Sequence, residues 1–170
     1  DQYGGISVII NNAGITEDKL FMRMSETSWD KVFAINLDAS MIICRKFIRG
    51  MVKNKWGRIV NISSVVASTG NPGQSNYVAA KSALNGLTKS LALEVATRGV
   101  TVNSISPGFI DTAMTAKLTD DQKRKITEKI PMGKMGTGED ISSLVSFLVS
   151  NEAGYITGQN IHVNGGLFLT

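Results

Sequence analysis

Short runs of β-branched apolar residues, separated by long amphipathic segments, constrain the fold of this sequence most strongly. The runs cover residues 6–10, 58–63, 100–105 and 161–163. Apolar residues at helical spacing indicate helices at about 26–55 and 74–98, and shorter helices are expected at 119–130 and 139–150. Strands joined by helices of this length form right-handed crossovers, which favour a parallel sheet covered on both faces. The sequence therefore predicts an α/β fold with a doubly wound parallel sheet.

A glycine-rich turn between a first strand and a first helix normally opens a doubly wound nucleotide-binding fold, and this sequence has none. Its nearest string, Gly136-Thr137-Gly138, follows no expected strand and precedes Glu139 and Asp140, which are typical of a capped first helical turn. The run 6–10 is apolar on both faces, which is typical of a central strand with neighbours on each side. We therefore expect residues 1–170 to be a single, partial domain, the C-terminal portion of a polypeptide that is longer at its N-terminus.

Composition excludes several functional classes. With 42% apolar and 19% charged residues among 170, the chain is an ordinary globular domain, and it has no apolar run long enough to span a membrane. The single cysteine, Cys44, and single histidine, His162, argue against a disulfide, a metal site or a His-based triad. We interpret Cys44 as a core residue and His162 as a packing or hydrogen-bonding residue. A net charge of +4 is too small to indicate nucleic-acid binding.

The basic residues are concentrated in one part of the chain. No acidic residue occurs between Asp38 and Glu94. A local positive field of this kind attracts an anionic ligand or an acidic partner, although several of these side chains are expected to be solvated on helix surfaces. The basic residues of this stretch are Arg45, Lys46, Arg49, Lys53, Lys55, Arg58, Lys81 and Lys89.

Tyr77 and Lys81 carry the strongest chemical signal. They are four residues apart on one expected helix, so their side chains share a face. A tyrosine pKa near ~10 is too high for efficient acid–base catalysis at neutral pH, and a nearby ammonium lowers it. Taken alone, such a pair is more often structural than catalytic.

Polar residues also gather at expected strand ends and within an apolar helix face. Ser64, the segment Asn12–Gly14 and the pair Pro107-Gly108 all follow strands, and parallel sheets bind ligands at the carboxyl ends of their strands. Asn36 lies between Ile35 and Leu37 on the apolar face of its helix. We interpret Asn36 either as a core amide that pins a neighbouring backbone or as one that opens the helix locally and holds a water.

Together these motifs resemble the short-chain dehydrogenase/reductase family, in order and spacing, along the whole chain. The matching elements are Asn11-Asn12-Ala13-Gly14, Asn36, Ser64, Tyr77-x-x-x-Lys81 and Pro107-Gly108. Further strings resemble the branch that reduces 3-oxoacyl groups on acyl carrier protein in fatty-acid synthesis: residues 11–16 (NNAGIT), 71–77 (NPGQSNY), 107–115 (PGFIDTAMT) and 155–166 (YITGQNIHVNGG). The family's fold is Rossmann-like.

The resemblance implies a role for each matching residue. Tyr77 would donate a proton to the keto oxygen, Ser64 would orient that oxygen, and Lys81 would bind the nicotinamide ribose and lower the tyrosine pKa. Asn36 would hold the water that links Lys81 to solvent. The cofactor-binding residues implied by the resemblance are Asn12, Ala13, Gly14, Tyr77, Lys81, Pro107, Gly108, Ile110 and Thr112.

The family expectation is an NADPH-dependent cytoplasmic enzyme, although the residues that distinguish NAD from NADP are outside this sequence. An organelle-targeting segment before residue 1 is left open. Alternatives within the family are an acetoacetyl-CoA reductase or a sugar, polyol or steroid dehydrogenase, and a non-catalytic fragment is the alternative outside it. An enoyl reductase is disfavoured because that group places its lysine further from the tyrosine.

The resemblance also implies two kinds of partner. Family members pair their two long helices with those of neighbouring copies, which predicts a homotetramer. The apolar residues Met41, Ile42, Phe47, Leu91 and Leu93 on these helices are consistent with such an interface. Acyl carrier protein is acidic, and Lys55 and Arg98 match the basic residues that receive it near the pocket entrance in similar reductases.

Overall fold

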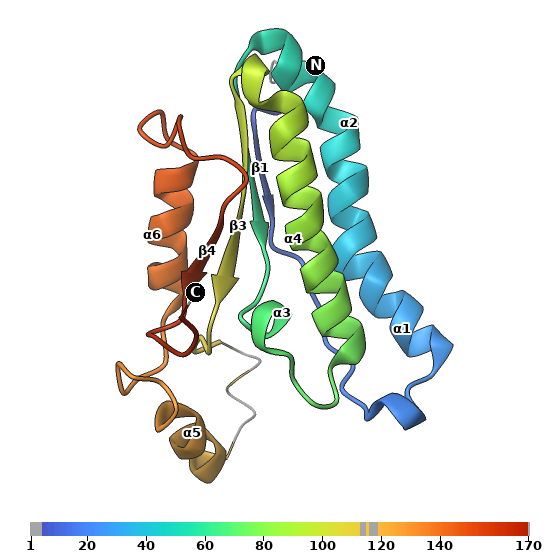
Figure 1. Cartoon of the computed structure of the whole chain (residues 1–170), viewed down its shortest axis with the longest axis vertical. Coiled ribbons are helices and arrows are strands. Elements are labelled where there is room, and N and C mark those ends of the chain that lie inside the picture. Colours follow the sequence, from blue (N-terminus) through green and yellow to red (C-terminus); the bar gives the residue numbers. More distant parts are fainter. Residues whose placement is uncertain (1–4, 113–114, 116–118, 170) are drawn as a thin grey trace.

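Four parallel strands form the sheet at the centre of the computed structural model, which describes residues 5–112, 115 and 119–169. They are β1 (Val8–Asn11), β2 (Gly57–Ile62), β3 (Val100–Pro107) and β4 (Asn160–Val163), and they lie in the order β1-β2-β3-β4 (Figure 1). The doubly wound parallel α/β fold predicted from the sequence is confirmed. Within the described residues β1 is an edge strand and Ile10 is 47% exposed, so a further strand beside β1 stays a prediction.

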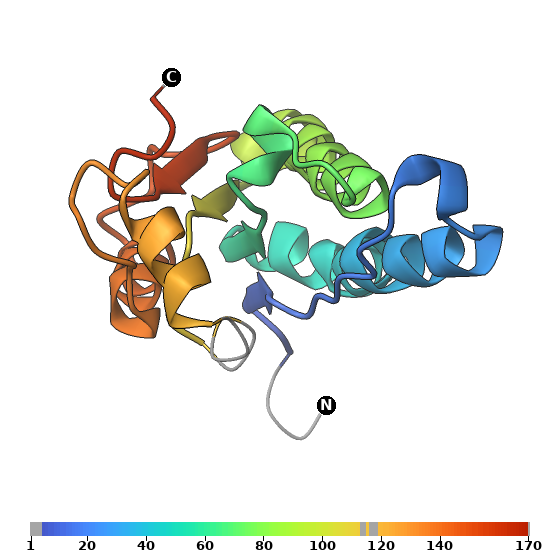
Figure 2. The same cartoon turned by 90° about the horizontal axis from the view of Figure 1, so that it is seen from below.

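Helices cover both faces of the sheet. One face carries α4 (Ser75–Val95) and a long helical segment made of α1 (Glu26–Phe33), a π-helical turn η2 (Ala34–Asp38) and α2 (Ala39–Asn54). The other face carries α6 (Gly138–Leu148), as the two perpendicular views show (Figures 1 and 2). Four short elements complete the chain: η1 (Phe21–Arg23), α3 (Val66–Thr69), η3 (Ala96–Arg98) and α5 (Asp120–Thr127).

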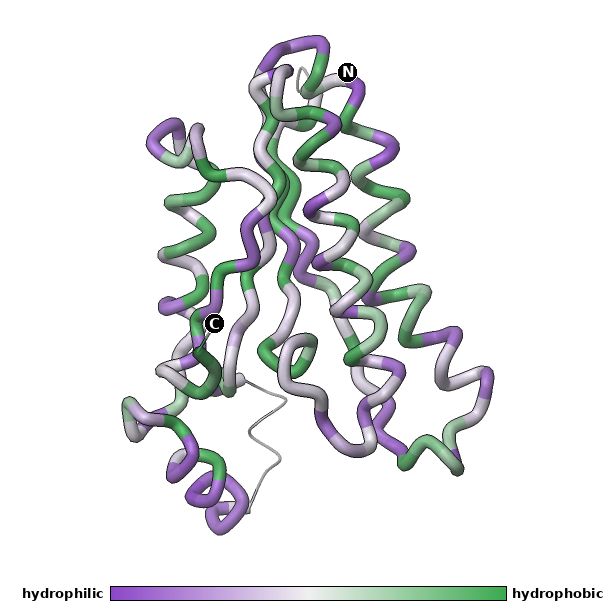
Figure 3. The backbone as a smooth tube through the Cα atoms, in the orientation of Figure 1, coloured by the Kyte–Doolittle hydropathy of each residue, from purple (hydrophilic) through white to green (hydrophobic). Residues whose placement is uncertain are grey.

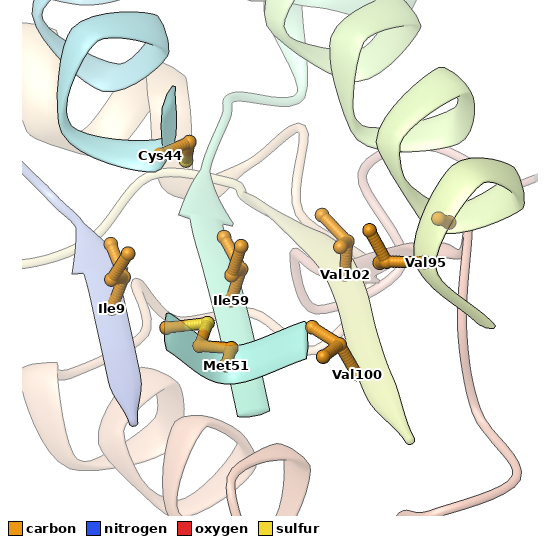
Figure 4. Packing of buried hydrophobic residues seen from close by; sticks show 8 residues of the cluster. Ile9, Cys44, Met51, Ile59, Val95, Val100 and Val102 are labelled. Atoms are coloured by element: carbon orange, nitrogen blue, oxygen red, sulfur yellow. The ribbon is translucent and has the colours of Figure 1, made fainter. Parts of the chain in front are cut away.

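Two hydrophobic cores hold these layers together. In the first, β-branched residues of the strands pack against α2 and α4, with Met51 and Cys44 on α2 facing Ile9 and Ile59 on the sheet (Figure 4). In the second, Val60 and Ile105 pack with Leu148 of α6 on the opposite face. The strands are accordingly hydrophobic along much of their length, whereas α5 is mostly hydrophilic (Figure 3). Cys44 is a core residue, as expected, and burial raises the pKa of its thiol.

Local sequence signals explain where the helices begin and end. The Ser25 side chain accepts a hydrogen bond from the Ser28 amide and caps α1, as expected from its position. Gly99 ends the α4 segment with φ +69°, and a Cβ there would lie 2.3 Å from the Lys55 carbonyl oxygen, so only glycine fits. Thr137 and Asp140 form a capping box at α6, which confirms that the Gly136–Gly138 string opens an ordinary helix.

Candidate active site

The carboxyl ends of β1, β2 and β3 surround a cavity of about 580 Å³. It lies where parallel α/β sheets bind their ligands. Eleven residues are candidates for catalysis or cofactor binding from the sequence, and nine of them line this cavity. These nine are Asn12, Gly14, Ser64, Tyr77, Lys81, Pro107, Gly108, Ile110 and Thr112. Ala13 is exposed and is not among the lining residues.

Lys81 is buried on α4, with only 3% of its surface exposed. Its Nζ donates a hydrogen bond of 2.7 Å to the Ile62 carbonyl at the end of β2. The same Nζ lies 5.7 Å from the centre of the Tyr77 ring. Burial lowers the pKa of Lys81 to about 8, because the ammonium has lost most of its hydration. The partner of this buried lysine is therefore a backbone carbonyl.

Burial dominates the ionisation of Tyr77. It raises the pKa of the phenol, the nearby Ser64 hydroxyl lowers it, and the carboxylate of Asp18 raises it further. The expected lowering of this pKa by Lys81 is not found, because desolvation of the phenolate outweighs the favourable effects. Tyr77 is consequently held in its protonated form, the form that a proton donor requires.

Asn36 lies at the centre of the π-helical turn η2 and is completely buried. Its Nδ2 donates to the carbonyl of Val32 and to that of Ile15, each at 2.9 Å, and its Oδ1 accepts from the Ile15 amide at 3.3 Å. The amide therefore pins the loop after β1, and it also sits in a locally widened helix. The pinned backbone and the local opening of the helix, one from each interpretation of Asn36, are both found here, and the bound water stays a prediction. π-Turns of this kind are frequent at functional sites.

The space beside Gly14 fits an elongated ligand with hydroxyl groups. A Cβ on Gly14 would lie 2.8 Å from Asn36 Oδ1 and 3.4 Å from Lys81 Nζ. A glycine at this position therefore keeps open the approach to both polar groups. Lys81 Nζ supplies hydrogen-bond donors at the base of the cavity, next to the Tyr77 phenol. This donor set fits the ribose of a nicotinamide nucleotide.

Two groups of cavity residues were not singled out from the sequence. Helix α6 contributes one wall, and its pattern resembles any half-buried helix, so nothing marked it in advance. The α6 residues at this wall are Gly138, Ile141, Ser142 and Val145. A second cavity of about 440 Å³ adjoins Tyr77 and Ser64 and includes Asp18, Asn71 and Gln74. The string NPGQSNY contained two of these residues, but spacing alone gave them no role.

Lys55 and Arg98 lie far from this site within the chain. Lys55 ends α2 immediately before β2, and Arg98 precedes β3, so both occupy the amino ends of the strands. The candidate catalytic residues occupy the carboxyl ends, one strand length away, which is ~20 Å for six residues. Within one chain these two cations therefore do not flank the cavity, because the crossover topology reverses direction between each helix and strand, and their part in carrier-protein docking stays a prediction.

The fold and the residues around the cavity together define the protein family. A Rossmann-like parallel sheet, a half-buried Tyr77 one helical turn from the buried Lys81, and Ser64 facing the same cavity are the defining features of the short-chain dehydrogenase/reductase family, to which this chain belongs. A family profile described as Enoyl-(Acyl carrier protein) reductase matches residues 1–168. The family's reactions use a nicotinamide cofactor.

Within this family, the chain is similar to several proteins of known name. The chain is 51% identical to the 3-oxoacyl-[acyl-carrier-protein] reductase FabG of Haemophilus influenzae over 170 residues, which is 100% of the chain and 70% of that relative. It is 53% identical to the FabG protein of Aquifex aeolicus over 164 residues, 96% of the chain and 66% of that relative. Nodulation protein G of a Rhizobium species is 53% identical over 163 residues, 96% of the chain and 66% of that relative. The chain spans about two thirds of the length of these relatives.

The described residues contain neither a candidate membrane-spanning helix nor a cluster of metal-ligating side chains. None of the described helices has the length and apolar character needed to cross a bilayer. Within residues 5–112, 115 and 119–169, no three His, Cys, Asp or Glu side chains cluster as metal ligands would. His162 lies in β4 and packs against Phe168, with ring centres 4.9 Å apart, in agreement with its interpretation as a packing residue.

Proposed function

We propose that this chain carries the catalytic residues of an NADPH-dependent 3-oxoacyl-[acyl-carrier-protein] reductase of fatty-acid synthesis, acting in the cytoplasm. The observation that carries the proposal is the convergence of Tyr77, Ser64 and Lys81 on one cavity. The similarity to FabG proteins along the chain supports the 3-oxoacyl substrate class. Residues 1–170 are proposed to form one partial domain of this family.

Each residue then has a defined task. The bound nicotinamide cofactor supplies the hydride that adds to the keto carbon. Tyr77 donates its phenolic proton to the keto oxygen, which becomes the new hydroxyl, and Ser64 hydrogen-bonds this oxygen and orients it. A protonated phenol is needed at the moment of transfer, and the raised pKa of Tyr77 keeps it available at neutral pH.

Lys81 and Asn36 are proposed to bind the cofactor and to return a proton to Tyr77. Lys81 binds the ribose hydroxyls with donors that are not used by the Ile62 carbonyl. Since its pKa is lowered to about 8, the ammonium can release a proton to the phenolate after each turnover at low cost. Asn36, in the π-helical turn behind Gly14, is proposed to hold the water through which this proton is replaced.

Reduction of an enoyl thioester is the second candidate, because the matching family profile carries that description. The spacing of Tyr77 and Lys81, one turn apart on α4, favours reduction of a ketone. The experiment compares acetoacetyl and crotonyl thioesters as substrates with NADPH and with NADH. We expect NADPH oxidation with the acetoacetyl thioester and little with the crotonyl thioester. Preferential reduction of the crotonyl thioester would replace the first proposal by the second.

A homotetramer assembled through α2 and α4 is part of the proposal. These helices expose Met41, Ile42 and Leu93, the last of which is 84% exposed. Met41 also lines a groove of about 470 Å³ between the two helices. Phe47 and Leu91, by contrast, pack against the chain's own core and are only partly available. An exposed apolar surface of this kind, on two neighbouring helices, can pack against the same surface of a second copy of the chain.

Carrier-protein docking is proposed to involve two copies. A two-fold axis perpendicular to α2 and α4 runs these helices antiparallel to those of the second copy. The end of α2 in one copy, with Lys55 and Arg98, then approaches the beginning of α4, which bears Tyr77, in the other. The two exposed cations are thus placed to receive an acidic carrier protein whose thioester enters the neighbouring copy's cavity.

A further inference from the structure

The second cavity lies next to the proposed catalytic residues, and one of the described residues that line it is charged. It has a volume of about 440 Å³ and shares Ser64, Tyr77 and Ile110 with the first cavity. A substrate whose keto oxygen meets Tyr77 and Ser64 while a cofactor occupies the first cavity must extend into the second. The charged side chain in the described lining is the carboxylate of Asp18.

The Asp18 carboxylate accepts hydrogen bonds from a neutral side chain, and no described cation forms an ion pair with it. Gln74 Nε2 donates to both Asp18 oxygens, at 3.0 Å each, and Gln74 Oε1 accepts from Asn71 Nδ2 at 2.8 Å. In the described part of the chain Asp18 takes part in no ion pair, whereas its neighbour Glu17 is paired with Lys31. The charge of Asp18 is therefore not cancelled by a described salt bridge.

The backbone holds Asp18 at the cavity wall. The Lys19 amide donates to the Gly73 carbonyl at 2.8 Å, and Asn76 Nδ2 donates to the Glu17 carbonyl at 3.3 Å. These bonds fasten the segment around Asp18 to the start of α4, on which Tyr77 lies. The carboxylate consequently keeps its place relative to the tyrosine, and its charge also raises the pKa of Tyr77.

We propose that Asp18 is a specificity-determining residue that selects 3-oxo substrates with a neutral carbon-1, such as thioesters, against free 3-oxo acids. This inference rests on the proposed 3-oxoacyl substrate. A free acid would bring a second carboxylate into a cavity that already holds one, and two like charges within one cavity repel each other even with partial screening. A thioester carries no charge at carbon-1 and therefore does not meet this repulsion from Asp18.

The kinetic experiment uses acetoacetate and the thioester acetoacetyl-N-acetylcysteamine as substrates of the wild type and of Asp18→Asn. The ratio of kcat/KM for the free acid to that for the thioester should rise by about tenfold in the variant at low salt. High salt should narrow this difference, because Asp18 is exposed to solvent. Glu17→Gln is the matched control: it removes a charge one residue away that is already paired, and its ratio should stay near that of the wild type.

A binding measurement separates this inference from the proposed function. Ligand-observed NMR titrations compare acetoacetate with methyl acetoacetate, its uncharged ester, and require no turnover. We expect Asp18→Asn to gain affinity for the acid by about tenfold relative to the ester. An unchanged relative affinity at low salt would overturn the role of Asp18. Failure of the wild type to reduce the thioester, with the expected shift in relative binding, would instead overturn the proposed function.

Discussion

Gly14 has no room for a side chain on the side of Asn36, because a Cβ on Gly14 would lie only 2.8 Å from Asn36 Oδ1. The loop after β1 and the π-helical turn η2 are therefore fitted to each other at the floor of the cavity. The amide of Asn36 is fixed by bonds to Ile15 and Val32 and has little freedom to retreat. The cavity floor is thus sensitive to a single methyl group.

Gly14→Ala should weaken cofactor binding and turnover together, by on the order of tenfold or more, because the methyl group displaces Asn36 and crowds Lys81. The measurements are the cofactor affinity and kcat of the variant. Gly50→Ala is the matched control: it lies within α2 with open space around its Cα, so it should leave activity unchanged and raise stability by ~0.5–1 kcal/mol. Normal cofactor affinity in Gly14→Ala would contradict the placement of the cofactor beside this glycine.

Lys81→Met should abolish activity and yet stabilise the fold at pH 7. Because the pKa of Lys81 is about 8 in the folded state and 10.5 when unperturbed, folding disfavours the ammonium, at a cost of about 3 kcal/mol below pH 8. The unfolded chain holds this proton more tightly, so the wild type gains stability as pH rises from 8 to 10.5. The advantage of the methionine variant, reduced by the loss of the bond to Ile62, should shrink over the same range.

Chemical denaturation of both proteins at pH 7 and pH 10 measures this effect. Lys89→Met, at an exposed position of the same helix, provides the control and should show no comparable pH dependence. A Lys81→Met variant that is less stable than the wild type by the same amount at both pH values would show that the buried ammonium carries no such penalty.

Leu93→Glu should dissociate the proposed tetramer without unfolding the chain, because Leu93 is 84% exposed and makes little contribution to the core. A charge in the middle of an apolar interface is left without a partner and weakens association. Light scattering at micromolar concentration, together with circular dichroism, provides the measurement. A wild type that is already monomeric under these conditions would refute the assembly.

Reversing both Lys55 and Arg98 to glutamate should raise the KM for acyl-carrier-protein substrates by on the order of tenfold at low salt. Turnover of acetoacetyl-CoA should change much less, since surface charges act mainly on encounter with a charged protein and are screened by salt. An unchanged ratio of the two specificity constants would remove these cations from the docking surface. If docking uses two copies, Leu93→Glu should reduce carrier-protein activity in the same way.

Periodicity and spacing predicted most of the fold and of the first cavity. The β-branched runs marked β1 to β4, and helical spacing marked α4, because burial on one or two faces leaves a regular pattern in sequence. Tyr77 and Lys81 were predictable for the same reason, since a helix fixes which residues share a face. A local opening of the helix at Asn36 was one of two interpretations of a polar residue in an apolar stripe, but the π-helical turn itself and the hydrogen bonds to Ile15 needed the structure.

Other features depend on how distant segments meet. The sequence did not indicate that α6 forms a wall of the cavity, because Ile141 and Val145 look like any core residues of a helix. The distance of Lys55 and Arg98 from the cavity of their own chain also needed the structure, because charge density along a sequence does not show which end of the sheet the charges occupy. Burial of Tyr77 could not be quantified from its spacing to Lys81, so the direction of its pKa shift was misjudged.

The most direct test of the central claim is the rate of NADPH-dependent reduction of an acetoacetyl thioester by the wild type and by Tyr77→Phe. The substitution removes only the phenolic hydroxyl, so the fold, checked by circular dichroism, should be unchanged. A positioned general acid contributes ~10²–10⁴-fold to a rate, and we predict a loss of at least that size in kcat. A variant that retains near-normal turnover would contradict the assignment of Tyr77 as proton donor and the reductase mechanism built on it.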